Sequence, residues 1–233
     1  MTVAALNRQL NRTLPDARME VVTLPDCGGL RLALISADYQ TGPLDPDVMQ
    51  AVIREPAYWS FCWGSGLALA RFLLQHPHRV RNRTVLDLGA GSGVAGIAAA
   101  LAGARRVIAC DTDPDALLAT RTNAELNGVS VSLTDRLSAA TAPQPGKADL
   151  LLMADVLYDR RNLPLLETAQ RHATEILVAD SRVTTLPDPS YREIASIDAR
   201  TLPNLGEFDE FRTAHLFEWR QTPPGRDTPV SRI

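Results

Sequence analysis

Short apolar runs alternate with helical patterns along most of the chain after residue 80. The apolar runs, which predict strands, are 84–89, 106–111, 131–135, 149–155 and 175–180. Helical patterns follow three of them, at 94–103, 113–128 and 162–173. Strands that alternate with helices predict crossover connections and a parallel sheet that is covered on both faces.

The N-terminal part of the chain does not share this alternation. We expect a short helix at about 3–12. The Asp-Cys-Gly-Gly segment between the extended stretches 19–24 and 30–36 is typical of a hairpin. The stretch 41–48 has the Gly, Pro and Asp content of a loop, and a helix is expected at 66–77, where a proline ends it.

The C-terminal part adds two strands, at 191–198 and 211–220, without a full helix between them. We therefore expect an α/β fold: a Rossmann-like, seven-stranded, mostly parallel sheet with an antiparallel C-terminal strand, helices on both faces and an N-terminal α/β extension. The extension, 1–60, is expected to contribute a short helix and hairpin that act as a lid over substrate or cofactor. The main domain is expected at 61–222, and 223–233 is expected to be a flexible tail.

The charge of the chain does not indicate a nucleic-acid partner. The formal net charge is -3, and no run of Lys or Arg is longer than two. Nucleic-acid binding usually leaves a basic patch or stripe in the sequence, so we expect none here. A small molecule or another protein fits this charge better.

Cysteine, histidine and hydropathy patterns exclude several other classes. Three scattered cysteines do not resemble a disulfide framework, and neither they nor the four histidines have zinc-ligand spacing. We expect no metal. No window reaches the roughly 18 apolar residues of a membrane helix, and the N-terminus lacks the apolar core of a signal peptide. We expect a cytoplasmic, monomeric protein that does not bind membranes.

A glycine-rich segment joins the first of the regular strands to the helix after it. The segment 85–96 reads VLDLGAGSGVAG, and its glycines allow a tight turn and a close approach of a ligand to the backbone. Gly91, Gly93 and Gly96 match the dinucleotide fingerprint, which also requires an acid about twenty residues later.

Two features of this segment argue against a dinucleotide. The turn begins at Gly89, and in that register the third glycine of the fingerprint would be Val94. Asp87, expected at the mouth of the loop, would repel a pyrophosphate. A carboxylate there suits a ligand that carries an ammonium and a sulfonium, and S-adenosyl-L-methionine carries both.

The segment VLDLGAGSG resembles the first motif of the class I, seven-stranded S-adenosylmethionine-dependent methyltransferases, and ACDTDPDAL resembles their second motif. The resemblance implies that the acid ending the second strand, Asp111, holds the ribose hydroxyls, whereas Asp113 is better explained as a helix cap. It implies S-adenosyl-L-methionine as the cofactor and a binding site that includes Asp87, Gly89, Ala90, Gly91, Gly93, Asp111 and Thr112. Ala154, in the strand at 149–155, is expected to belong to the same site.

The strand at 149–155 ends in a carboxylate. The segment ADVLYD starts at Ala154 and places Asp155 and Tyr158 directly after the apolar run LLLM. If the strand order reverses after 84–89, this end lies beside the glycine loop, where ligands bind in such sheets. Asp155 can then accept a hydrogen bond from an attacking nitrogen, and the ring of Tyr158 can stack on the developing charge. The alternative is a polar strand end without function.

The D-x-x-Y arrangement resembles the family-16-like protein methyltransferases, most of which act on lysine. The segment 55–77 resembles the part before the first motif in lysine methyltransferases of the electron-transfer-flavoprotein β-subunit type, with their Trp-x-x-Gly-x-x-Leu-Ala-Arg pattern. This resemblance implies that Trp63 lies against the cofactor; simple core packing is the alternative.

One segment departs from this family. Where those enzymes often have an acid followed by a tryptophan that packs on the adenine, this chain has Asp135 and Arg136. The guanidinium plane of Arg136 can cover the adenine, and Asp135 can accept a hydrogen bond from the exocyclic amine.

The resemblance implies methyl transfer to lysine in a protein substrate. Lysine must arrive uncharged, although its usual pKa is about 10.4, so a partly desolvated channel is expected. Candidate channel residues are Tyr58, Trp59, Phe61 and the stretch 205–211, in which Glu207, Asp209 and Glu210 can attract a basic protein surface. The alternatives are a small-molecule N-methyltransferase and a non-catalytic cofactor-binding module; the intact acids of the motifs argue against the module.

Overall fold

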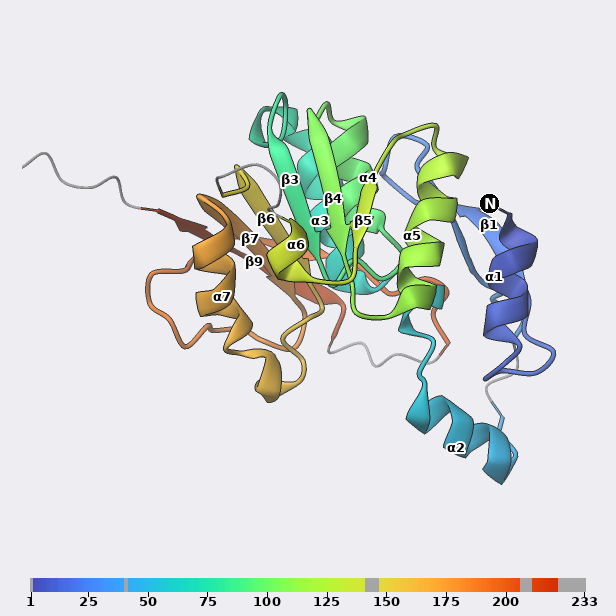
Figure 1. Cartoon of the computed structure of the whole chain (residues 1–233). Helices are drawn as coiled ribbons and strands as arrows, with labels where there is room; N and C mark the ends of the chain where they lie inside the picture. The colour runs from blue at the N-terminus through green and yellow to red at the C-terminus, as the bar shows by residue number, and fades with distance from the viewer. Residues whose placement is uncertain (1, 40–41, 141–146, 206–210, 222–233) are drawn as a thin grey trace, which may run out of the picture.

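The computed structural model describes residues 2–39, 42–140, 147–205 and 211–221. A seven-stranded sheet forms its centre, with the strand order β5-β4-β3-β6-β7-β9-β8 (Figure 1). The strands are β3 (Thr84–Leu88), β4 (Arg106–Cys110), β5 (Ser132–Thr134), β6 (Leu150–Ala154), β7 (Glu175–Asp180), β8 (Arg192–Asp198) and β9 (Thr213–Arg220). All seven correspond to strands that the sequence predicts.

The strand directions also agree with the sequence-based prediction. Strands β5, β4, β3, β6 and β7 pair in parallel, and β9 runs antiparallel to both of its neighbours, β7 and β8. The chain moves from β3 outward to β5 and then returns to the other side of β3 with β6. This reversal brings the carboxyl ends of β3, β4 and β6 together, which is where open α/β sheets bind ligands.

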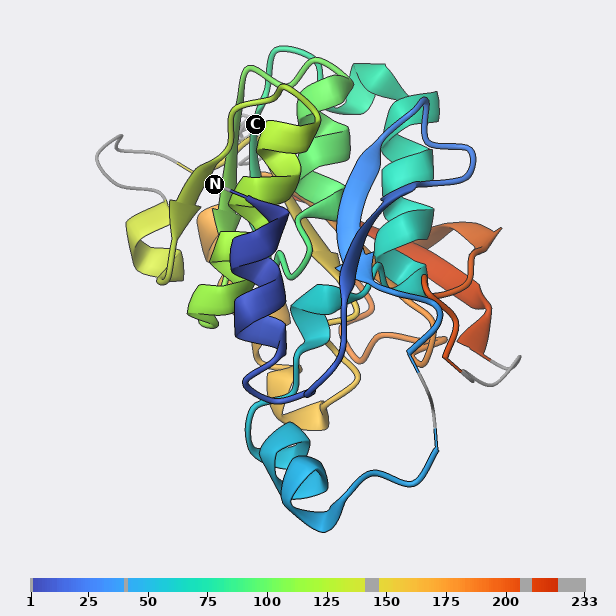
Figure 2. The ribbon, with the colours of Figure 1, turned by 90° about the vertical axis from the view of Figure 1, so that its right-hand side faces the viewer.

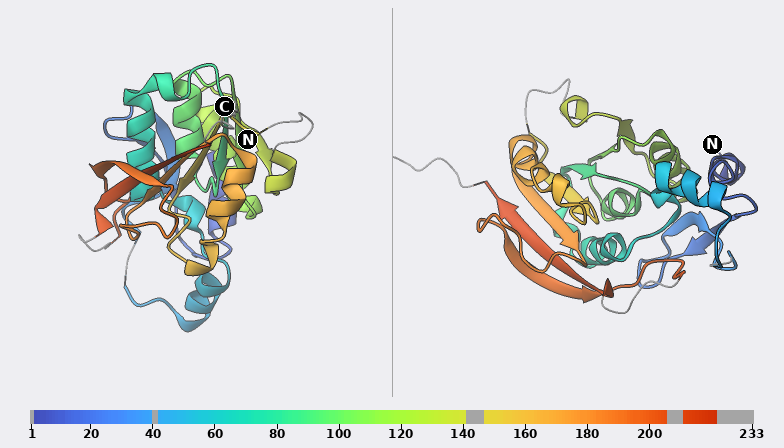
Figure 3. Two further views of the ribbon diagram at one scale, coloured as in Figure 1. Left: turned by 90° about the vertical axis from the view of Figure 1, so that its left-hand side faces the viewer. Right: turned by 90° about the horizontal axis from the view of Figure 1, so that it is seen from below.

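Helices cover both faces of the sheet, as expected (Figure 3). On one face lie α3 (Gly64–Gln75), α4 (Val94–Leu101) and α5 (Pro114–Leu126); on the other lie α6 (Leu137–Ala140) and α7 (Leu165–His172). Each face has its own apolar core, because successive residues of a strand point to opposite sides. In β6, Leu150 and Leu152 join one core, and Leu151 and Met153 join the other.

The N-terminal extension consists of α1 (Val3–Leu10), a hairpin of β1 (Met19–Thr23) and β2 (Arg31–Ile35), and α2 (Pro46–Arg54). The two hairpin strands pair antiparallel, as predicted. The interpretation of 41–48 as loop is wrong for its last residues, because α2 starts at Pro46. The Asp45 side chain caps this helix by accepting a hydrogen bond from the Asp47 N–H, and the proline suits its first position.

The extension shares a core with the main domain. Leu6 and Leu10 of α1 and Ile35 of β2 are fully buried in one cluster with Ala116 and Ala119 of α5. Figure 2 shows α1 and the hairpin lying along the body of the protein, whereas α2 stands apart from it. The extension therefore packs as part of the same body as the main domain, and the division expected at residue 60 stays a prediction. The expected tail, 223–233, lies outside the described residues.

In the part of the chain that the structure describes, no helix has the length and apolar character needed to cross a bilayer. Nor do three or more His, Cys, Asp or Glu side chains gather there in a way that could hold a metal ion.

Candidate active site

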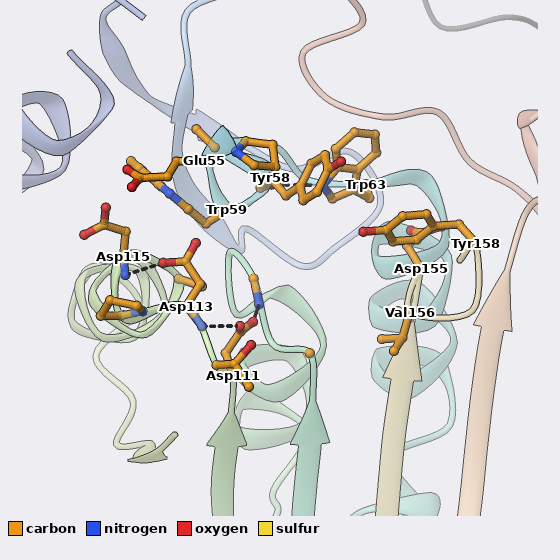
Figure 4. Close-up of a pocket in the computed structure, with 18 of the residues that line it drawn as sticks. Glu55, Tyr58, Trp59, Trp63, Asp111, Asp113, Asp115, Asp155, Val156 and Tyr158 are labelled. Atoms are coloured by element: carbon orange, nitrogen blue, oxygen red, sulfur yellow. Dashed lines mark hydrogen bonds between the residues drawn. The ribbon is translucent and has the colours of Figure 1, made fainter. Parts of the chain in front are cut away.

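A cavity of about 760 Å³ lies at the carboxyl ends of β3, β4 and β6. This volume is within the range of about 300–1,000 Å³ that is usual for small-molecule sites. Among the residues that the sequence singles out, those lining it are Trp63, Gly89, Gly91, Asp111, Thr112, Ala154, Asp155 and Tyr158, together with the channel candidates Tyr58 and Trp59. Figure 4 shows Asp111 and Asp113 on one side of the cavity and Asp155 and Tyr158 on the other.

The glycine loop forms the floor of the cavity with backbone atoms. Gly89 and Gly91 have positive φ angles of 72° and 52°, which suit glycine. A Cβ on Gly91 would meet no atom within 4 Å, so its backbone is open toward the cavity, whereas a Cβ on Gly89 would lie 2.7 Å from the Val156 side chain. The loop therefore allows a ligand to approach the main chain at Gly91. Ala90 and Gly93 belong to the same loop but do not line the cavity.

The structure corrects the expected position of Asp87. Strand alternation directs this side chain between β3 and α4, where its Oδ2 accepts a hydrogen bond of 2.8 Å from the Gly96 N–H. Asp87 is 2% exposed and does not line the cavity. Burial raises the pKa of Asp87 to about 7. Asp87 thus supports the loop from behind, and the expectation that its charge lies at the loop mouth is wrong.

Other carboxylates supply the negative charge that was expected of Asp87. Asp111, Asp113, Asp115, Asp155 and Glu55 line the cavity, against the two cations Arg12 and Arg182 among its described lining residues. A pyrophosphate is disfavoured by such a lining, and a cationic ligand is favoured.

Two backbone N–H groups orient the Asp111 carboxylate and leave it able to accept further hydrogen bonds. Its Oδ2 accepts from the Gly91 N–H at 2.9 Å and its Oδ1 from the Asp113 N–H at 3.0 Å. A carboxylate has about four acceptor sites, so two remain for hydroxyl groups of a ligand. Burial, partly offset by these hydrogen bonds, raises the pKa of Asp111. Asp113 caps α5 by accepting from the Asp115 N–H at 2.8 Å, as the sequence predicts.

Asp155 is fixed by the start of α3. Its two carboxylate oxygens accept hydrogen bonds from Ser65, one from the hydroxyl at 2.6 Å and one from the backbone N–H at 3.0 Å. Its φ of 53° is unusual for a residue other than glycine. Burial raises the pKa of Asp155 to about 7, and the nearby Asp180 adds to the rise. The β6 carboxylate therefore changes its charge close to neutral pH.

Aromatic side chains line the cavity on the same side as this carboxylate (Figure 4). The Tyr58 ring lies edge-on to Trp63 and to Tyr158, with centroid distances of 5.8 and 6.1 Å. Phe61 packs against Trp63 at 5.3 Å, and the Trp63 Nε1–H donates to the Tyr58 carbonyl at 2.9 Å. The result is a group of rings beside Asp155 that can bind a cation through their faces.

Two predicted cofactor residues, Asp135 and Arg136, do not line the cavity. Their side chains are 66% and 77% exposed and lie 3.7 Å from each other. The stretch 205–211 offered further candidates, but Glu207, Asp209 and Glu210 lie outside the described residues.

The sequence-based reasoning missed several residues of the cavity wall. Those from the extension are Gln9, Arg12, Thr13, Glu55, Pro56 and Ala57; Asn162 and Arg182 come from the main domain. No local motif marks those of the extension, because they reach the cavity only when α1 and the segment that follows α2 pack beside α5. The segment 55–58 directly precedes the aromatic Trp59, and its position before the tryptophan motif was the available signal.

The cavity fits S-adenosyl-L-methionine in its donor and acceptor chemistry. Asp111 offers acceptors for the ribose hydroxyls, and Gly91 presents a backbone surface without a side chain. The anionic lining complements the ammonium and sulfonium of that molecule.

Comparison with known proteins agrees with this assignment. The ribosomal protein L11 methyltransferase (PrmA) family matches residues 69–173. The chain is 38% identical over 130 residues to the electron transfer flavoprotein beta subunit lysine methyltransferase of Mus musculus. The aligned region covers 53% of this chain and 50% of that protein. Its Danio rerio counterpart is 37% identical over 158 residues, covering 65% and 57%. The chain thus spans about half the length of these relatives.

A solved structure supports the fold. The ribosomal protein L11 methylase from Lactobacillus delbrueckii subsp. bulgaricus superimposes with a TM-score of 0.52 at 22% identity, covering 87% of this chain and 100% of that one. The seven-stranded sheet with its antiparallel C-terminal strands, and the cavity at the carboxyl ends of β3, β4 and β6, agree with the fold that the sequence motifs indicate. The chain has the fold and the sequence motifs of the class I S-adenosylmethionine-dependent methyltransferases, and it is related to the electron transfer flavoprotein β-subunit lysine methyltransferases and to the ribosomal protein L11 methyltransferase family.

Proposed function

We propose that this protein transfers methyl groups from S-adenosyl-L-methionine to lysine side chains of a protein substrate. The observation that carries the proposal is the position of Asp155 and Tyr158, which lie at the end of β6 beside the glycine loop and face Tyr58 and Trp63. The relatives named for lysine and ribosomal-protein methylation support a protein substrate.

The cofactor supplies the methyl group as an electrophile bound to sulfur. Asp111 holds the ribose, and the backbone at Gly91 allows close approach of the cofactor. The rest of the chemistry concerns the acceptor nitrogen, which must be neutral when it attacks and becomes positively charged as it does so. The protein therefore has to remove or exclude one proton and to stabilise one developing charge.

Asp155 suits both tasks. With a pKa raised to about 7 by burial, the carboxylate is ionised above neutral pH and can accept a hydrogen bond or a proton from the nitrogen. Its charge then stabilises the forming ammonium. The rings of Tyr58, Trp63 and Tyr158 exclude water and attract the cation through their faces. Ser65 keeps the carboxylate oriented, so little reorganisation is needed.

The direct test is methyl transfer from labelled S-adenosylmethionine to purified electron transfer flavoprotein β subunit, to ribosomal protein L11 and to a lysate of the source cell. Labelled residues are identified by mass spectrometry. The chain contains a single lysine, Lys147. It precedes the amino end of β6, opposite the cavity, and donates to the Gln170 carbonyl at 2.7 Å. Lys147→Arg therefore removes self-labelling at lysine side chains without disturbing the site.

Two variants separate catalysis from cofactor binding. Asp155→Asn should lower turnover by about 10²–10³-fold, because it removes the charge that stabilises the ammonium, while affinity for S-adenosylhomocysteine stays within a few-fold. Asp111→Ala should lower that affinity at least tenfold, because each hydrogen bond to a charged group contributes roughly 1.5–3 kcal/mol. Asp113→Ala is the control, and its effect on affinity should be smaller. Label on a small molecule only, or wild-type turnover by Asp155→Asn, would contradict the proposal.

A further inference from the structure

Exposed apolar side chains occur both in the lining of the cavity and on helix α2, which precedes it in the chain. The large apolar side chains that are exposed in the described part of the chain are Val21, Met49, Ile53, Tyr58, Leu101 and Tyr158. Two of these, Tyr58 and Tyr158, line the cavity, and two more, Met49 and Ile53, lie on α2. Ile53 is 75% exposed, the largest value among the six. Exposed apolar groups that cluster in this way are typical of interaction surfaces.

The structure of α2 explains this exposure. The apolar residues Val48 and Val52, four positions apart, pack partly against the core that contains α1 and α5, while Met49 and Ile53 form the adjacent stripe on the helix. No residue of α2 is buried. The helix is nevertheless well specified, by its Asp45 cap and by Pro46. An apolar stripe that a folded helix keeps in solvent requires a reason other than stability.

The stripe is continuous with the rim of the cavity. The chain leaves α2 at Arg54, and the next four residues, 55–58, all line the cavity. Figure 1 shows that the parallel strands point toward the side of the molecule on which α2 stands. On that side, α2 projects from the body beyond the carboxyl ends of the strands (Figures 1 and 2), and it meets the body through Val48 and Val52. A molecule that reaches from the cavity over Tyr58 therefore meets α2 next.

The charged residues on and beside α2 indicate the chemistry of the partner. Asp45 and Asp47 lie at the start of α2 and Glu55 directly after its end, against one cation, Arg54, within this segment. Glu55 lies 4.0 Å from Arg12 and its side chain is 65% exposed, so the pair is weak and open to solvent. An apolar stripe between acidic ends fits a protein surface that presents an apolar side chain with basic neighbours.

We propose that Met49 and Ile53 of α2, together with Tyr58, form the docking surface for the acceptor protein and select it by an apolar side chain beside the target lysine. The proposal rests on the proposed protein-lysine methylation. A small acceptor would be enclosed by the cavity itself and would not need an apolar stripe outside it. The occupant is thus the substrate protein rather than a second copy of this chain.

The test compares the double variant Met49→Ser/Ile53→Ser with Leu101→Ser. Leu101 is the matched control, since it is an apolar helix residue that is 42% exposed but lies at the end of α4, away from the cavity. The probe is electron transfer flavoprotein β subunit or, if the wild type does not label it, the protein labelled in the lysate. For the double variant we expect KM for this protein to rise at least tenfold, with kcat and S-adenosylhomocysteine affinity within twofold. Leu101→Ser should leave all three within twofold.

Several outcomes would overturn the docking surface. Unchanged KM in the double variant, or an equal rise in Leu101→Ser, would show that the stripe does not recognise the acceptor. Light scattering supplies a further readout: if the wild type is a dimer and the double variant a monomer, a second copy covers α2 instead. Failure of the proposed function differs from all of these, because the wild type itself would then label no protein.

Discussion

In the proposed reaction, the Asp155 carboxylate accepts the proton of the acceptor nitrogen, and the Ser65 hydroxyl holds that carboxylate in place. Ser65 is 0% exposed, and it uses both its hydroxyl and its N–H on the two oxygens of Asp155. These bonds favour the ionised carboxylate, whereas burial and Asp180 favour the protonated one. These opposing effects give Asp155 a pKa of about 7, so that its carboxylate can accept a proton near neutral pH.

Ser65→Ala should move the pH dependence of methyl transfer upward. The ionised carboxylate is the active form, so kcat rises as the pH passes through the pKa of Asp155, which is about 7. Removing a hydrogen bond to a charged group costs about 1.5–3 kcal/mol, and each pKa unit is worth about 1.4 kcal/mol. The ascending limb should therefore shift by roughly one pH unit or more toward alkaline values.

The measurement is a pH–rate profile of wild type, Ser65→Ala and Ser65→Thr. The threonine variant keeps a hydroxyl and should return most of the limb to its original position. A role of Ser65 in folding alone would lower the rate at every pH without moving the limb, and that result would contradict the assignment.

At the scale of elements, α5 joins the glycine loop to the N-terminal hairpin. Asn123 is fully buried; its Oδ1 accepts from the Ala33 N–H of β2 at 2.7 Å, and its Nδ2–H donates to the Ser92 carbonyl of the loop at 2.9 Å. One turn later, Asn127 exchanges hydrogen bonds with the backbone of Arg31. A single amide thus connects the cofactor loop with the extension.

Asn123→Leu should destabilise the protein and weaken cofactor binding together. The substitution leaves two buried backbone groups without partners, at about 1–3 kcal/mol each, and it removes the hydrogen bond that holds the Ser92 carbonyl. Asn127→Ala is the matched control on the same face, where the bonds are exposed and the loss should be smaller. Urea denaturation and calorimetry with S-adenosylhomocysteine measure both effects. If Asn127→Ala proved the more damaging variant, the role given to Asn123 would be wrong.

At the scale of the whole molecule, the main architecture followed from sequence patterns. The strand–helix alternation after residue 80, the hairpin and the cap at Asp113 were all predicted and are confirmed. They depend on periodicity and turn chemistry, which are local properties. The reversal of strand order was assumed rather than read from the sequence, and the sheet confirms it.

The predictions that the structure contradicts concern long-range packing, that is, which distant residues a side chain contacts. Asp87 looked exposed at a loop mouth, but the strand directs it under α4, and its neighbour Gly96 has no side chain to occupy that space. Asp135 and Arg136 were assigned by position after a strand, although that strand, β5, is at the sheet edge and away from the cavity. Asn123 lies within the predicted helix 113–128, and nothing local indicates that a hairpin from residues 19–35 packs on it.

In the extension, α1 and the hairpin pack on the core, whereas α2 has no buried residue. Two variants test this difference. Deleting residues 1–36 removes α1 and the hairpin, uncovers Ala116 and Ala119, and leaves the buried Asn123 amide without Ala33. We expect this variant to be insoluble or to unfold well below the wild type. Replacing 44–54 with a glycine-serine linker of equal length removes only α2, which has no buried residue.

The linker variant should fold, and S-adenosylhomocysteine should raise its Tm as much as it raises that of the wild type, because a ligand that binds only the folded state stabilises it by mass action. Methylation of the acceptor protein should nevertheless fall at least tenfold, since the stripe that binds it is gone. Thermal unfolding with and without the ligand, together with labelling of the acceptor, measures all of this. An unchanged Tm after deletion of 1–36 would contradict the packing role of α1 and the hairpin. Full activity of the linker variant would contradict the docking role of α2.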